Sequence, residues 1–345
     1  MVIRDWSSDV CSSDLGCRQR IKRLLNAPEQ CSIVLAPNAT HALNLAVAGY
    51  KKNQPIRIVS TVTEHNSVIR PISHRVREFG GEAIWVSCSS DGRLDMEAYE
   101  AAFKSPVDLV VINHASNVTG MIADAGACFR YAKSRGAVTA LDASQTFGII
   151  PVDASALSAD IIAFTGHKGL LGPSGTGGLY VRPDIRLEPL TVGGTGTRSD
   201  RLYQPDDMPA RLECGTPNSP AFAGLNCALD WLDLNGDLFR KTKSERYKAL
   251  RDGLASIPKV RLYGDGQSEN TGIVSLTVEA WRTDDLGEVL GDSFGIVCRT
   301  GLHCAPMIHS AIGSAPDGTV RLSVSGFNSE SDIIAAVDAV RTIAK

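Results

Sequence analysis

Short apolar runs alternate with amphipathic segments through the first half of the chain. The apolar runs, rich in β-branched residues, occupy residues 31–36, 56–62, 82–87, 108–116, 137–144 and 160–166. Segments with the spacing of an amphipathic helix separate them, at residues 17–27, 41–50, 67–80, 94–104 and 126–136. Apolar runs of this length between helices are typical of buried parallel strands. We therefore predict an α/β fold whose mostly parallel sheet is covered by helices on both faces.

The pattern changes after residue 183. Residues 183–220 are rich in proline, glycine and aspartate, as loops are. Helical spacing returns, and the rest of the chain carries shorter segments of both kinds, at residues 223–236, 239–257, 272–278, 284–290, 295–300, 319–325 and from Ser329 onward. A chain of 345 residues exceeds a typical single core. We predict a large domain over 16–235 and a smaller α+β C-terminal domain over 236–345.

Residues 1–15 differ from the rest of the chain. The tripeptide SSD occurs at 7–9 and again at 12–14, and no apolar period is present that a helix or strand could bury. Polar repeats of this kind bury too little apolar area to offset the entropy of ordering the backbone. We predict that residues 1–15 are disordered and contribute no functional group.

Composition excludes several classes of protein. The net charge of −3 gives no basic surface for nucleic acid or an anionic membrane, and no apolar run approaches the roughly 20 residues that cross a bilayer. Nine cysteines, an odd number without a C-x-x-C pair, argue against a disulfide framework and a zinc site. We expect a cytoplasmic protein with no metal centre, in which a cysteine stays reduced.

Candidate chemistry begins at the end of the first predicted strand. Asn38, Ala39 and Thr40 end that strand and open a helix. The free N–H groups at a helix N-terminus, together with a threonine hydroxyl, can bind a phosphate. The plain alternative is an N-cap with no ligand.

Polar residues follow three further strands. His65 comes after residues 56–62, Asn117 after 108–113, and Asp142 and Gln145 after 137–141. Each of them alone has an ordinary structural explanation, as a hydrogen-bonding, turn or N-cap residue. In parallel sheets, however, ligands bind at the carboxyl ends of the strands, where these residues lie.

The segment after the strand at 160–166 changes this balance. Thr165, His167 and Lys168 follow an apolar strand directly and precede a glycine-rich turn. A lysine in this position is partly desolvated, which lowers its pKa and frees the amine for Schiff-base chemistry. A surface lysine is a weaker explanation, because phosphate-binding residue types flank this one and Asp142 ends the preceding strand.

These motifs, taken in order, resemble a known family. The sequences NATHALN, TEHNSVIRP, HASNVTG, DASQ, FTGHKGLLGPSGTGGLYV, ECGTPN, RTGLHCAP and GTVRLSVSGFN run from residue 38 to residue 328. Together they resemble the class V aminotransferases, and within them the cysteine desulfurases with a short cysteine loop. The resemblance implies the fold of the pyridoxal 5′-phosphate (PLP) dependent transferases of fold type I.

The same resemblance implies a role for each matching residue. Lys168 would carry PLP as a Schiff base, Asp142 would pair with the pyridine nitrogen, and His65 would stack on the ring. The remaining cofactor contacts would come from Asn117 and Gln145 at the phenolic oxygen and from Ala39, Thr40, Thr165 and His167 at the phosphate. Thr216 would reach the phosphate of a neighbouring subunit in a homodimer. Arg321, with Arg299, would bind the substrate carboxylate.

Cys304 decides the reaction type that the resemblance implies. It follows Arg299 and His303 in a glycine-containing loop, and cationic neighbours favour the reactive thiolate form of a cysteine. The expected reaction converts L-cysteine to L-alanine and leaves a persulfide on Cys304 for an acceptor protein.

Three alternatives remain open at this point. A selenocysteine lyase or another class V aminotransferase would use the same PLP-binding residues. The third alternative is an inactive fragment, because the family normally carries a further segment before the helix near Cys17. Here the SSD repeats take its place, which suggests an N-terminally truncated reading frame.

Overall fold

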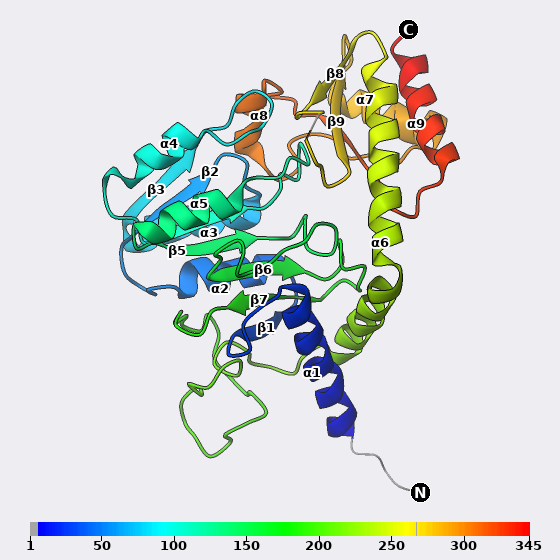
Figure 1. Ribbon diagram of the computed structural model, residues 1–345. Helices are drawn as coiled ribbons and strands as arrows, with labels where there is room; N and C mark the ends of the chain where they lie inside the picture. Colours follow the sequence, from blue (N-terminus) through cyan, green and yellow to red (C-terminus); the bar gives the residue numbers. More distant parts are fainter. Residues whose placement is uncertain (1–5, 267) are drawn as a thin grey trace, which may run out of the picture.

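The computed structural model describes residues 6–266 and 268–345, and its centre is a seven-stranded sheet (Figure 1). The strand order is β1-β7-β6-β5-β4-β2-β3. The strands are β1 (Ser32–Ala36), β2 (Ile56–Thr61), β3 (Gly81–Val86), β4 (Leu109–Asn113), β5 (Val138–Asp142), β6 (Ile161–Thr165) and β7 (Gly177–Val181).

The sheet is mostly parallel, as the alternation of strands and helices predicts. Strands β3, β2, β4, β5 and β6 pair in parallel, whereas β7 pairs antiparallel with both β6 and β1. Strand β7 is not predicted, because its five residues lie in a glycine-rich segment that is typical of a turn. The carboxyl ends of β2, β4, β5 and β6 therefore meet at one edge.

Two apolar cores cover the two faces of this sheet. Alternate strand residues face opposite sides, so that Ile33 belongs to one core and Val34 to the other. Helices α2 (Ala39–Gly49) and α3 (Asn66–Phe79) complete the core on the side of Val34. The opposite core is completed by α1 (Trp6–Leu24), α4 (Met96–Ala101) with the short η1 (Ala102–Lys104), α5 (Ala125–Ser134) and the first part of α6 (Ser219–Ala255).

A second, smaller sheet forms a core of its own. It is antiparallel, with β10 (Val320–Ser323), β9 (Ile273–Val278) and β8 (Val260–Tyr263) in that order. Helices α7 (Thr283–Phe294) and α9 (Glu330–Ile343) pack against it, and α8 (Pro306–Ile312) lies between this sheet and the large one (Figure 1). Ser329 caps α9, where the sequence predicts the closing helix to begin.

Helix α6 connects the two cores without interruption. Two helical segments are predicted here, and the structure has one helix of 37 residues. Phe239 packs in the large core and Tyr247 in the small one. The predicted domain boundary at residue 236 thus lies within a helix, so the division into 16–235 and 236–345 remains a proposal.

The predicted disorder of residues 1–15 is wrong for the backbone from Trp6 onward. Helix α1 begins at Trp6 and continues through the predicted helix at 17–27, ending at Leu24. Cys17 and Ile21 are buried in the large core, and α1 lies beside the first half of α6 (Figure 1). Continuing an established helix costs less than starting one, so a polar segment can extend it. Residues 1–5 lie outside the described residues.

Two further differences concern the C-terminal part. The predicted strand at 295–300 is reduced to a single antiparallel bridge between Arg299 and Arg321. Helix α8 was not predicted. Among the described residues, no helix has the length and apolar content needed to cross a membrane.

Candidate active site

Two cavities lie side by side at the carboxyl edge of the large sheet. One, of about 270 Å³, extends towards the N-terminus of α2, and the other, of about 340 Å³, extends towards α6. Both are lined by the same central set, His65, Asn117, Gln145, Lys168 and Arg299. The structure therefore brings together strand ends that lie far apart in sequence.

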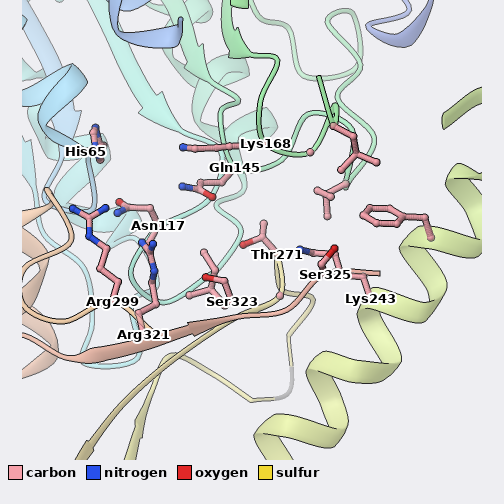
Figure 2. A pocket seen from close by; sticks show the side chains of 16 residues that line it. His65, Asn117, Gln145, Lys168, Lys243, Thr271, Arg299, Arg321, Ser323 and Ser325 are labelled. Atoms are coloured by element: carbon pink, nitrogen blue, oxygen red, sulfur yellow. The ribbon is translucent and has the colours of Figure 1, made fainter. Parts of the chain in front are cut away.

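Lys168 points into the centre of this space (Figure 2). It lies in the turn after β6, and this turn packs closely against the loop after β5, since a Cβ on Gly169 would lie 2.4 Å from the carbonyl oxygen of Phe147. The side chain is open to the cavity but surrounded by protein. This desolvation lowers its pKa, and Arg321 and Arg299 act in the same direction against the opposing charge of Asp142. The amine is thus biased towards the neutral, nucleophilic form.

The smaller cavity ends at donors suited to a phosphate. Asn38 caps α2 and accepts the N–H of His41 at 2.9 Å. The N–H groups of Ala39 and Thr40, at the first turn, have no partner within the helix itself. Across the cavity, Thr165 Oγ1 and His167 Nδ1 lie 2.9 Å apart.

His65 lies over the cavity at the start of α3. It caps this helix, because Ser67 N–H donates to His65 Nδ1 at 3.0 Å. Ser67 Oγ also lies 2.8 Å from Thr40 Oγ1, which links the two helix starts. Burial lowers the pKa of His65, and Lys168 and the two arginines reinforce the effect despite Asp142. A neutral ring of this kind can stack on a flat cofactor.

Asp142 ends β5 at the floor of the smaller cavity and is buried. Its Oδ1 accepts hydrogen bonds from Ser144, from the backbone N–H at 2.9 Å and from the hydroxyl. Gln145, three residues on, lines both cavities. Asp142 supplies the negative charge at this position.

Asn117 connects this edge to the C-terminal sheet. Its Nδ2 donates to the backbone carbonyl oxygen of His303 at 2.7 Å, and its backbone carbonyl oxygen accepts from Arg321 Nη1 at 2.8 Å. Its Oδ1 is buried and has no partner among the described residues. Arg299 and Arg321 pair through their backbones and extend into the larger cavity together (Figure 2).

Cys304 lies beside the smaller cavity. Arg299 Nη2 donates to its Sγ at 3.0 Å, which places a guanidinium against the sulfur. Cys304 lines a groove of about 500 Å³ over α2 and α3, to which Thr40, His65 and Ser67 also contribute. The thiol and the cofactor cavity therefore share a wall.

Glu64 lies directly before His65, in the loop between β2 and α3, and is not predicted from the sequence. It is completely buried, and its Oε1 accepts the N–H of Asn113 and the hydroxyl of Thr61, each at 2.9 Å. Burial raises the pKa of this carboxyl to about 8, and the charge of Asp142 adds to the rise. Glu64 therefore keeps its proton near neutrality. Sequence alone cannot find it, because glutamate beside a histidine reads as a surface residue.

Other lining residues were also missed, and one predicted residue lies elsewhere. Ser67 and Ser144 orient His65 and Asp142, as hydrogen-bonding residues two positions away. Lys243 of α6 lines the larger cavity, where burial lowers its pKa to about 8. No signal separates Lys243 from the other cations of its helix. Thr216 is exposed in the loop before α6 and lines neither cavity.

The residues present fit PLP. A carboxylate, a lysine of lowered pKa and a helix start suited to a phosphate lie around one cavity, and Asn117 Oδ1 is a buried polar atom without a partner among the described residues. Among the described residues, no cluster of side chains could hold a metal ion.

Comparison with known proteins gives a consistent result. The family profile described as Aminotransferase class-V matches residues 11–335, which includes part of the segment predicted to lie outside the family. A protein named probable cysteine desulfurase from Methanothermobacter thermautotrophicus is 34% identical over 92% of this chain and 80% of that protein. A protein named cysteine desulfurase from Pectobacterium atrosepticum is 31% identical over 88% of this chain and 76% of its own length.

Solved structures agree. The apo structure of a cysteine desulfurase from Thermococcus onnurineus superimposes with a TM-score of 0.91 at 28% identity, covering 99% of this chain and 86% of that one. A cysteine desulfurase from Escherichia coli, solved in an S-sulfonic acid form, gives a TM-score of 0.88 at 26% identity with the same coverage.

Proposed function

Because the chain belongs to the class V aminotransferases, we propose that it is a PLP-dependent cysteine desulfurase, which converts L-cysteine to L-alanine. The observation that carries the proposal is the thiol of Cys304, held by Arg299 beside the cavity that contains Lys168. Simple transamination has no use for a nucleophilic thiol at this position, whereas sulfur transfer requires one.

The cofactor would occupy the smaller cavity. Lys168 would attach it covalently, Asp142 would pair with the pyridine nitrogen, and His65 would cover the ring. We assign the phosphate to Ala39, Thr40, Thr165 and His167, and the ring oxygen to Asn117 and Gln145. When bound, PLP supplies an electron sink that acidifies the Cα of the substrate.

Two arginines would orient the substrate. A guanidinium binds a carboxylate with two parallel hydrogen bonds, a geometry that lysine lacks. Arg321 is already fixed by Asn117, and its Nε is buried without a partner among the described residues. Arg299 lies next to it and adds positive charge.

Lys168 and Cys304 would perform the chemical steps of the protein. The lowered pKa of Lys168 lets its amine accept the Cα proton near neutral pH. The Cys304 thiolate then attacks the substrate sulfur, so that an S–S bond forms and the substrate C–S bond breaks. The bonding electrons of the C–S bond stay with the carbon skeleton, which takes up a proton and leaves as alanine. A persulfide remains on Cys304.

The persulfide needs an acceptor, for which we propose a protein thiol. We further propose a homodimer, in which the exposed Thr216 reaches the phosphate of the other subunit, and a cytoplasmic location. A selenocysteine lyase would use the same residues, so both amino acids are tested as substrates.

The decisive measurement is alanine formation from L-cysteine by the full chain with PLP. No 2-oxo acid is added. Without a reductant, we expect one persulfide on the protein for each alanine formed; with a reductant, we expect multiple turnovers. Alanine or glutamate formation that depends on a 2-oxo acid would instead identify an aminotransferase. A higher rate with L-selenocysteine than with L-cysteine would identify a selenocysteine lyase. No product from either amino acid would support the inactive fragment.

A further inference from the structure

The loop that carries Cys304 has an unfavourable backbone conformation. We define the Cys304 loop as residues 301–305. His303 and Cys304 have φ angles of +52° and +58°, the left-handed region that residues with a Cβ rarely adopt. Two such residues in succession persist only where surrounding contacts hold them.

Hydrogen bonds to His303 and Cys304 hold this part of the loop in place. Asn117 Nδ2 donates to the carbonyl oxygen of His303, and the backbone N–H of Asn66 donates to that of Cys304, each at 2.7 Å. The His303 ring is buried, with Nε2 2.8 Å from Thr319 Oγ1. The first two donors belong to the large sheet's loops, after β4 and at the start of α3. The large sheet thus sets the shape of a loop in the C-terminal part of the chain.

Asn117 is also linked to Cys304 by a second route. The backbone carbonyl oxygen of Asn117 accepts a hydrogen bond from Arg321 Nη1. Arg321 in turn exchanges backbone hydrogen bonds with Arg299, at 2.7 and 3.1 Å. Arg299 in turn contacts Cys304 Sγ. Asn117 therefore contacts the Cys304 loop through its side chain and, through Arg321, is linked to the segment that carries Arg299.

We propose that Asn117 is a positioning residue for the nucleophile, whose side-chain amide holds the Cys304 loop so that Sγ stays against Arg299. This role is separate from contact with the cofactor, since an amide nitrogen carries two hydrogens and only one is used on His303. The inference rests on the proposed function only in taking Cys304 as the nucleophile.

The test is the rate at which iodoacetamide alkylates Cys304 at pH 7, followed by mass spectrometry of the peptide that contains it. The full chain is used with and without added PLP, so that cofactor loss is separated from loop placement. We expect Asn117→Ala to slow alkylation about threefold to tenfold, because Sγ is no longer held against the Arg299 guanidinium. Asn44→Ala is the matched control, since Asn44 lines the groove that contains Cys304 but donates its side-chain hydrogen bond to Thr40 and not to the loop, and it should leave the rate unchanged.

A double variant separates positioning from a general structural effect. Arg299→Ala should slow alkylation by a similar factor, and adding Asn117→Ala to it should slow it no further, because Asn117 acts through that contact. If Asn117→Ala does not fold, Asn117→Asp replaces it, which keeps the size and removes the donor. A wild-type rate in the Asn117 variants, or losses that multiply in the double variant, would overturn the proposal. Neither result depends on whether the chain desulfurates cysteine.

Discussion

The cofactor cavity and the Cys304 loop meet at one place but are built in different ways. The cavity is formed by what we call the strand-end wall, the residues at and just after the carboxyl ends of β2, β4, β5 and β6. Ladder hydrogen bonds between buried strands fix these backbone positions. The Cys304 loop has no such ladder beyond residue 301 and depends on individual hydrogen bonds from Asn117 and Asn66.

Burial keeps one titratable group uncharged in each region, an acid in the wall and a base in the loop, so the two pKa shifts have opposite directions. In the strand-end wall, Glu64 is held protonated, with its pKa raised to about 8. In the loop, His303 is held neutral, because burial, together with Arg321, lowers its pKa to about 3. Cofactor binding would depend on strand ends held by the ladder of the sheet, whereas placement of the nucleophile depends on a few hydrogen bonds. The two functions should therefore separate under mutation.

The largest expected effect comes from the strand-end wall. Lys168→Ala should abolish desulfuration and the covalent, borohydride-reducible attachment of PLP, because no other lysine among the described residues lines the smaller cavity. Alkylation of Cys304 should continue at the wild-type rate, since the loop does not contact Lys168. Mass spectrometry after reduction checks both, and a cofactor adduct on another lysine would refute the assignment.

The converse change belongs to the loop. Cys304→Ser should retain bound PLP, measured by its absorbance, but stop sulfur release from L-cysteine. A serine hydroxyl is a poor nucleophile towards sulfur at neutral pH without a dedicated base. Cys298→Ser is a matched control, because that cysteine lies in the same segment but lines none of the three cavities described above. Undiminished turnover in Cys304→Ser would exclude sulfur transfer through this residue.

Arg321 contacts both regions, so its replacement should have an intermediate effect. Arg321→Lys keeps the charge but loses the paired geometry for a carboxylate. We expect the KM for L-cysteine to rise about tenfold, the loss of a single charge-assisted hydrogen bond, with a smaller change in kcat. Steady-state kinetics decide this, and an unchanged KM would place the substrate carboxylate elsewhere.

The remaining effects are on the pH dependence of stability and not on activity, and their signs differ between the regions. Glu64 binds its proton more tightly in the folded protein, so its contribution is present at acidic pH and is lost as pH rises from about 4.5 towards 8. Glu64→Gln should reduce the fall in the free energy of unfolding over this pH range, by up to about 1.4 kcal/mol for each pH unit. Urea denaturation from pH 5 to 8 measures the slope.

His303 should act on the acid side. Its folded pKa lies below the unfolded value, so the folded protein resists protonation and loses stability as pH falls from about 6.5 towards 3. His303→Asn should flatten this range while tolerating the positive φ, which asparagine adopts more readily. His114, whose pKa burial lowers to about 4, remains as a second acid-sensitive group. An unchanged slope would mean that His303 is protonated in the folded state.

Much of the fold and the strand-end wall could be predicted because both follow local patterns. Buried parallel strands read as apolar runs, and the sheet brings their carboxyl ends together. His65, Asp142, Thr165 and Lys168 were therefore found from their places after such runs, and the structure groups them in one cavity. Family resemblance, and not periodicity, supplied Cys304 and Arg321.

The misses have a common cause, which is that they depend on contacts between distant segments. The antiparallel β7 and the unbroken α6 are stabilised by packing on elements elsewhere in the chain. The proton on Glu64 depends on complete burial beneath the sheet edge.

The sequence alone predicts the parallel strands of the sheet and the polar residues at its edge, since strand spacing and strand-end residues are local properties. How the nucleophile is held depends on contacts that exist only in the folded chain. The hydrogen bond from Asn117 to His303 joins residues 186 positions apart. Neither residue can be predicted from the other in the sequence, because a hydrogen bond between two loops depends on where the two sheets place the strands that the loops follow.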